Sequence, residues 1–319
     1  MNVIFMGTPE FAVPSLSSLA ASAHKIIRVI TQPDRPKGRS KTPCPSPVKK
    51  IAQDLGLEIL QPANVNDEAV IKELRDLSPD CIVVVAFGQL LSYSIIHLPR
   101  YQCVNIHSSL LPKLRGAAPI NWAIIRGESV TGVTVMVMTV KMDAGDIILQ
   151  KTIPIVSGEN AGELEKRLAP AGAELLLEAL DLIENGKATY TRQDENEVTF
   201  APKIKKGDGL ISWSQETEKI HNHIRGLTPA PGAYTFSVKS NTAEKKRIIV
   251  KKTNICDMKK TKTSFSPGTV IEIAPCGIHV ATLDGFICIT RLQPEGKREM
   301  GVQEYIHGYK TKANDTFIS

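Results

Sequence analysis

The first two thirds of the chain alternate short apolar segments with segments in which apolar residues recur every three or four positions. The apolar segments are rich in Val and Ile and cover residues 2–7, 25–32, 57–62, 81–87, 102–107 and 132–138. Such segments are typical of buried strands, and helical spacing between them indicates parallel βαβ units. We therefore predict an α/β fold: a Rossmann-like, mostly parallel sheet with helices on both faces. The longest helical pattern, residues 159–186, contains Pro170, which could kink it or split it in two.

The pattern changes near residue 205. A charged, glycine-containing stretch at 203–209 is a plausible linker, and one amphipathic segment follows at 216–225. After it, short strand-like segments are separated by turn residues at the spacing of a small barrel. The pattern predicts two domains, 1–205 and 206–319, the second an OB-like β-barrel.

Composition narrows the class of protein. The chain has 319 residues, 42% of them hydrophobic and 23% charged, and no apolar run reaches the length of a membrane span. The first residues lack the basic stretch of a secretory signal. The six cysteines form no CxxC pair, which predicts reduced thiols in a cytoplasmic protein and no metal site.

The positive charge is concentrated at one end. Residues 1–205 hold 22 Lys and Arg against 22 Asp and Glu, whereas residues 206–319 hold 17 against 11. A basic domain beside a neutral one indicates a polyanionic partner such as nucleic acid. Solubility alone would also explain the excess.

Phosphate-binding motifs are missing from the first domain. GTPEF, after the first predicted strand, is not GxGxxG, and the sequence contains no GxxxxGK[ST]. This argues against a dehydrogenase or an NTPase.

Instead, two polar residues lie at the end of the predicted strand 102–107. Asn105 and His107 are two apart, so their side chains point to the same face. In an open α/β sheet, ligands bind beyond the carboxyl ends of the strands. An amide and an imidazole there could polarise a carbonyl and hold the oxyanion formed when it is attacked. The alternative is a buried pair satisfied by backbone groups.

A carboxylate is available after the next strand. Asp143 and Asp146 lie in the turn DAGD, and either could fix the protonation state of His107 and help remove a proton from an attacking amine. Ordinary turn chemistry would also explain both residues. Spacing alone does not choose between them.

These motifs resemble the folate-dependent formyltransferase family. The similar segments are NIHSSLLP, RGAAPINWAI and the DAGD turn, and IFMGTPEFAVPSL, TQPDRPKGRSKTPCPSPVKK, VVVAFGQLL and IRGLTPAPGAYT resemble the members that formylate methionyl-tRNA. The resemblance covers nearly the whole chain. It implies an enzyme that transfers the formyl group of 10-formyltetrahydrofolate to the α-amine of methionyl-initiator tRNA, for translation initiation.

The family's motifs also imply roles for single residues. Asn105, His107 and Asp143 match its catalytic residues, the first Asp of the turn being the family's aspartate. The folate-binding residues would be Phe87, Gly88, Ser109, Leu110, Leu111 and Pro112. The flat, mostly apolar rings of a folate suit such a cleft, and no metal is implied.

The loop 32–50 would face the tRNA. Its basic residues suit phosphates, and the implied contacts are Arg35, Lys37, Arg39 and Lys41, with Arg39 matching an arginine that reads the acceptor end. Without the resemblance, the loop would be an ordinary solvated one. One departure concerns Ala230, where many relatives have Trp and hence a stacking surface.

Two other functions fit parts of the sequence. A formyltransferase acting on glycinamide ribonucleotide or an amino sugar would share Asn105, His107 and Asp143, but the basic loop and basic barrel argue against a small substrate. A non-catalytic RNA-binding protein would not need the three residues. We expect a monomer whose partners are folate and initiator methionyl-tRNA.

Overall fold

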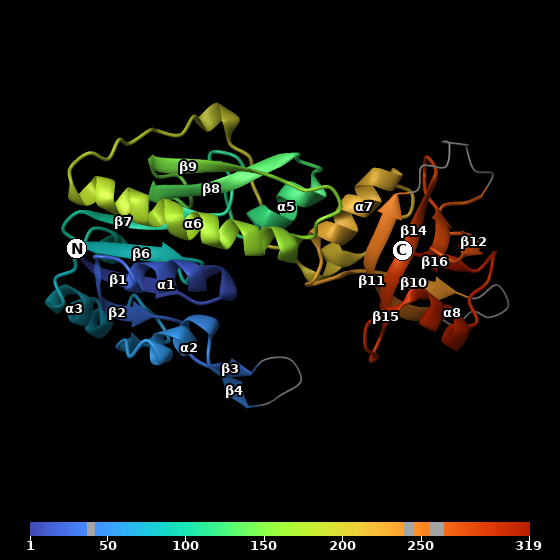
Figure 1. Cartoon of the computed structure of the whole chain (residues 1–319), viewed down its shortest axis with the longest axis horizontal. Coiled ribbons are helices and arrows are strands. Elements are labelled where there is room, and N and C mark those ends of the chain that lie inside the picture. Colours follow the sequence, from blue (N-terminus) through green and yellow to red (C-terminus); the bar gives the residue numbers. More distant parts are fainter. Residues whose placement is uncertain (37–41, 239–244, 256–264) are drawn as a thin grey trace. The chain divides into compact units, whose positions relative to one another are not determined.

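The chain forms two compact units (Figure 1). The computed structural model describes residues 1–36, 42–238, 245–255 and 265–319. The first unit comprises residues 1–119, 130–154 and 165–202, and the second comprises 120–129, 155–164 and 203–319. The boundary predicted at 205 stays a prediction, because the second unit also takes in two segments from the N-terminal part. No helix in the described ranges is long and apolar enough to cross a membrane.

A seven-stranded sheet forms the centre of the first unit. Its strands are β1 (Asn2–Gly7), β2 (Lys25–Ile30), β5 (Ile59–Leu60), β6 (Cys81–Val85), β7 (Gln102–His107), β8 (Val130–Val137) and β9 (Ile147–Pro154), and a separate hairpin joins β3 (Arg35–Pro36) to β4 (Pro43–Cys44). The order is β5-β2-β1-β6-β7-β8-β9. Pairing is parallel from β5 to β7 and antiparallel at β8 and β9. The predicted mostly parallel sheet is confirmed.

Helices cover both faces of this sheet, as predicted. The helices are α1 (Val13–Ala20), α2 (Pro47–Asp54), α3 (Glu68–Asp76), α4 (Tyr93–Ile96) and α6 (Ala161–Glu184), with short 3₁₀ helices at Glu10–Ala12 and Glu195–Glu197. A further helix, α5 (Pro119–Ile125), belongs almost entirely to the second unit. α6 is one continuous helix with Pro170 inside it, so the pattern is not split there.

The packing of α6 decides which way the polar residues of β7 point. A Cβ on Gly172 of α6 would lie 3.0 Å from the Ile106 side chain, so Ile106 faces α6. Since side chains alternate along a strand, Asn105 and His107 face the opposite side. That side is covered by α3 and α4, because Leu74 and Ile95 share one core cluster with strand residues such as Val84.

The second unit is built around an antiparallel sheet. Its strands are β10 (Ala233–Val238), β11 (Lys245–Ile255), β12 (Val270–Ala274), β13 (Gly277–Ala281), β14 (Phe286–Pro294), β15 (Met300–Gly301) and β16 (Thr316–Ile318), with α7 (Thr217–Gly226), α8 (Val302–Tyr309) and a 3₁₀ helix at Lys206–Gly209. The order is β12-β13-β14-β11-β10-β16.

The two outer strands of this sheet also meet. Thr269 bridges Thr316, the Val270 N–H donates to the Asp315 carbonyl at 2.8 Å, and the Phe317 N–H donates to the Gly268 carbonyl at 2.7 Å. These bonds join β12 to β16 and close the sheet into a barrel, as predicted. Trp213 and Phe317 are stacked inside it, with ring centroids 5.9 Å apart.

Candidate active site

His107 ends β7 and is almost fully buried, with 6% of its surface exposed. Its Nε2 lies 2.9 Å from the carbonyl oxygen of Leu114. A carbonyl oxygen only accepts hydrogen bonds, so Nε2 is the protonated nitrogen of the neutral ring. Nδ1 is therefore the nitrogen that can exchange a proton at the site.

Asp143 lies beside that nitrogen. Its Oδ1 is 3.7 Å from His107 Nδ1, and its Oδ2 accepts a hydrogen bond of 2.8 Å from the Gly116 N–H. The first distance is too long for a direct hydrogen bond and fits an ion pair when the imidazole is protonated. The Asp146 side chain is exposed instead. The fold thus brings Asp143, and not Asp146, to His107.

Asn105 is half-buried on the same strand face as His107. It lies in the middle of the sheet, paired in register with Val84 of β6 and Met136 of β8. The rigid strand fixes the spacing of the amide and the imidazole. A half-buried amide therefore lies on the strand face that also carries His107, which is paired with Asp143.

A buried network that sequence reasoning missed supports the turn containing Asp143. Asp143 has a φ of 52°, a left-handed conformation that is uncommon for a residue with a side chain. The Gln193 Nε2 group donates to the carbonyls of Asp143 at 2.9 Å and Gly145 at 2.7 Å. Arg115 Nε in turn donates to Gln193 Oε1 at 3.0 Å, and both side chains are buried.

Glu195 closes the network at its outer end. It accepts hydrogen bonds from Lys141 at 2.9 Å and from Arg115 at 3.0 Å, and these bonds lower the pKa of Glu195 to about 2. The positive charge of the buried Arg115 is thereby balanced by the carboxylate of Glu195. Gln193 lies outside any helix or strand, and Glu195 begins the 3₁₀ helix at Glu195–Glu197. No sequence pattern marks either residue, whereas Arg115 belongs to the RGAAPINWAI segment noted above.

Gly116 occupies a position that excludes other residues. Its φ is 123°, and a Cβ there would lie 2.7 Å from the carbonyl oxygen of Ala201. The backbone on both sides is fixed, because the Arg115 N–H donates to the Thr199 carbonyl at 2.9 Å and the Ala201 N–H to the Arg115 carbonyl at 2.7 Å. The N–H that holds Asp143 is thus placed by the backbone.

The predicted folate segment is held firmly by the sheet. Ser109 Oγ donates to the Lys113 carbonyl at 2.6 Å, and the Leu111 N–H donates to Thr134 Oγ1 at 3.2 Å. Ser109 and Leu111 are buried, so they shape the turn, while Leu110 and Pro112 keep part of their surface exposed.

Phe87 and Gly88 follow β6. The Phe87 ring is buried in the core, and its carbonyl accepts a hydrogen bond of 2.9 Å from Thr8 Oγ1. Gly88 is exposed with a φ of 91°. Phe87 therefore packs into the core at the carboxyl end of β6, and the backbone of Gly88 is accessible to a ligand.

Only the base of the predicted tRNA loop can be described. Arg35 is exposed on β3, whereas Lys37, Arg39 and Lys41 lie outside the described residues. Asp34 accepts hydrogen bonds from Gln61 at 2.8 Å and Lys49 at 2.7 Å, which lower the pKa of Asp34. The loop therefore starts from a fixed point.

Two family models match the chain. "Formyl transferase" matches residues 1–180, and "Formyl transferase, C-terminal domain" matches residues 203–310. The chain belongs to the formyl transferase family. The resemblance read from the sequence motifs is thus confirmed, and the site described above lies within the first matched region.

Curated relatives of this formyl transferase share its full length. It is 45% identical over 310 residues to the methionyl-tRNA formyltransferase of Geotalea uraniireducens, covering 97% of this chain and 96% of the relative. It is 43% identical over 310 residues to that of Citrifermentans bemidjiense, covering 97% and 94%.

Two solved structures share the fold of this chain. An N-formyltransferase from Helicobacter canadensis, in complex with folinic acid and dTDP-3-aminofucose, has a TM-score of 0.66 and 18% identity, covering 94% of this chain and all of that one. HypX from Aquifex aeolicus with tetrahydrofolic acid has a TM-score of 0.62 and 19% identity, covering 97% and 47%.

Proposed function

We propose that this formyl transferase moves the formyl group of 10-formyltetrahydrofolate to the α-amine of methionyl-initiator tRNA. The observation behind the choice of acceptor is the identity of 43–45%, over nearly the whole length, to methionyl-tRNA formyltransferases. The excess of basic residues after residue 205 suits a tRNA better than a small amine. The scattered cysteines favour a cytoplasmic location.

The geometry of the site supports the chemistry. The neutral α-amine attacks the formyl carbon, and a new C–N bond forms while the carbonyl oxygen becomes an oxyanion. The Asn105 amide and the His107 imidazolium, through Nδ1–H, stabilise that oxyanion. Asp143, 3.7 Å from His107 Nδ1, pairs with the imidazolium and accepts the proton that the attacking nitrogen releases.

Breakdown of the intermediate completes the transfer. The carbonyl re-forms, the bond between the formyl carbon and N10 breaks, and the proton held at the site passes to N10. Formylmethionyl-tRNA and tetrahydrofolate leave, so atoms and charge balance without an oxidant or a metal. The part-exposed apolar surface of Leu110 and Pro112 suits the folate rings.

The test compares acceptors. Labelled 10-formyltetrahydrofolate is supplied with charged initiator tRNA, glycinamide ribonucleotide or an amino-sugar nucleotide, and kcat/KM is measured for each. We expect transfer to tRNA to exceed the others by orders of magnitude. A preference for a small amine would reassign the substrate, and tRNA binding without transfer to any acceptor would indicate a non-catalytic RNA-binding protein.

A further inference from the structure

Three potential metal ligands meet in the second unit, although no short metal-binding motif joins them in the sequence. Cys276 lies in the two-residue turn between β12 and β13, His279 on β13, and Cys288 on β14. His279 and Cys288 are directly opposite each other in the antiparallel pair, so their side chains lie on the same face. Strand register, and not a CxxC spacing, brings them together.

The distances fit a single small ion. The Sγ atoms of Cys276 and Cys288 and a ring nitrogen of His279 all lie within 4.8 Å of one another. Cys276 Sγ is 3.5 Å from His279 Nε2. Zinc bound tetrahedrally to one sulfur and one nitrogen would hold these two atoms about 3.5 Å apart, given its usual bond lengths.

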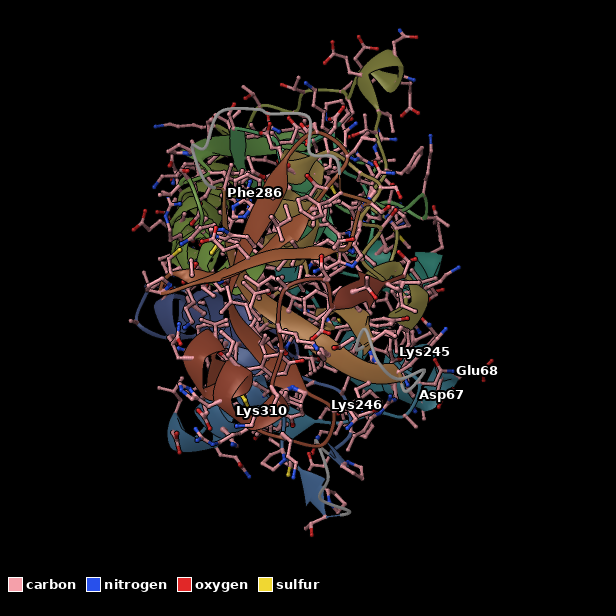
Figure 2. The ribbon with its side chains drawn as sticks, turned by 90° about the vertical axis from the view of Figure 1, so that its right-hand side faces the viewer. Asp67, Glu68, Lys245, Lys246, Phe286 and Lys310 are labelled. Carbon is pink, nitrogen blue, oxygen red and sulfur yellow. The ribbon has the colours of Figure 1, made fainter. Side chains whose placement is uncertain are left out.

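The surroundings leave room for the Cys288 sulfur and orient the imidazole. A Cβ at Gly277 would collide with Cys288 Sγ, so a larger residue there would displace the sulfur. His279 Nδ1 faces Glu272 Oε2 at 3.6 Å. Zinc-binding histidines commonly direct their second nitrogen at a carboxylate, which fixes the ring and strengthens the ligand. Phe286, labelled in Figure 2, packs its ring 5.4 Å from that of His279.

We propose that Cys276, His279 and Cys288 bind one zinc ion, with Glu272 orienting His279 and a water molecule in the fourth position. Two thiolates and an imidazole select a soft or borderline ion such as Zn²⁺ over Mg²⁺ or Ca²⁺. Binding converts the two thiols to thiolates and releases two protons to solvent. The ion would tie the β12–β13 turn to β14 and stabilise this side of the barrel.

Cobalt is the probe for the test, because Zn²⁺ has no visible spectrum. The full-length protein is treated with a chelator, dialysed under reducing conditions and titrated with Co²⁺. We expect one equivalent to bind, with thiolate-to-cobalt absorption in the near ultraviolet and tetrahedral bands in the visible region. Zn²⁺ should abolish both signals and raise the thermal midpoint of the apoprotein.

Substitutions show whether the cobalt absorption arises from the three proposed ligands. Cys276 is exposed, so Cys276→Ser should fold normally by circular dichroism and bind Co²⁺ at least about tenfold more weakly. Glu272→Gln should weaken binding about tenfold. Cys44→Ser removes a thiol outside the cluster and should bind like the unchanged protein.

Several results would overturn the proposal. One is the absence of the cobalt bands in the unchanged protein, and another is equal affinity in Cys276→Ser. A mass two hydrogens lower after isolation without reductant, with peptides linking Cys276 to Cys288, would identify a redox pair instead.

Discussion

The two ring nitrogens of His107 have different roles. Nε2 is held by the Leu114 carbonyl, and Nδ1 faces Asp143. The neutral ring therefore has a fixed tautomer, and protonation adds its charge next to the carboxylate. Asp143 is itself fixed by the Gly116 N–H, so the pair needs little rearrangement before reaction.

We expect His107→Ala and Asp143→Asn each to lower kcat at least about a hundredfold, the usual scale of lost acid–base or oxyanion assistance. Formyl transfer to charged tRNA and folate affinity are measured in parallel, and affinity should change much less. Asp146→Asn, in the same turn, is the matched control and should stay near normal. If Asp146→Asn were the crippling change, the assignment of Asp143 would be wrong.

Substitutions of Arg39 test the prediction that the loop 32–50 contacts the tRNA. Arginine can hold a phosphate bidentately or stack on an unpaired base, and lysine does neither, so Arg39→Lys should not restore function. Both Arg39→Lys and Arg39→Ala should lower kcat/KM for tRNA, by about 1–3 kcal/mol in transition-state binding. A methionine ester serves as the small acceptor. Equal losses on both acceptors would place Arg39 in the folate site or the fold.

At the scale of elements, the turn after β8 depends on a residue fifty positions away. Gln193 donates to two carbonyls of the turn, those of Asp143 and Gly145. Sequence periodicity predicted β7 and the common face of Asn105 and His107, because that relation is local. It could not predict Gln193, because only the folded chain brings that residue to the turn.

We expect Gln193→Ala to lower both stability and turnover. It leaves two carbonyls and the Arg115 Nε–H without this partner, at about 1–3 kcal/mol for each buried group left unsatisfied. Displacement of Asp143 should lower kcat between about tenfold and a hundredfold. Urea unfolding and kcat are measured beside Gln293→Ala, whose amide donates to Lys297 at the surface. Normal kcat with reduced stability would show that Gln193 supports only the fold.

The contact between α7 and β11 should make stability depend on pH. Burial, with Arg225 nearby, lowers the pKa of His221 to about 4, and His221 Nδ1 lies 2.9 Å from Thr253 Oγ1. Above pH 6.5 the ring is neutral in both states and has no effect. As pH falls from 6.5 toward 4, the unfolded chain binds the proton first, which favours unfolding.

The free energy of unfolding measured at pH 7 and pH 4.5 should therefore fall less in His221→Gln than in the unchanged protein. His97→Gln, at an exposed position directly after α4, is the control. An identical decrease in His221→Gln would show that other groups cause the acid sensitivity.

At the scale of the whole molecule, the basic excess lies in residues 206–319. Lys245 and Lys246, labelled in Figure 2, are exposed at the start of β11. The sequence alone predicted the strands and the charge of this part. The sequence predicted closure of the barrel only through the spacing of its strands, because the bridge between Thr269 and Thr316 joins positions far apart in the chain.

We expect the double variant Lys245→Ala and Lys246→Ala to bind tRNA more weakly. Its affinity should also depend less steeply on salt concentration. Each lost phosphate contact lowers the slope of log affinity against log salt by about 0.7–0.9. The matched control neutralises Lys72 and Lys166, exposed on α3 and α6. An unchanged slope in the first pair would mean that these two lysines serve solubility.

Barrel closure by β16 also sets an order of events during protein synthesis. The first sheet has all its strands once Pro154 has left the ribosome, whereas the barrel lacks an edge until Thr316–Ile318 have emerged. Nascent chains that carry the open barrel expose unpaired strand edges, which invite pairing between neighbouring chains. The second unit therefore completes its folding only once Thr316–Ile318 have paired, and chaperones that shield strand edges should act on this part of the chain until then.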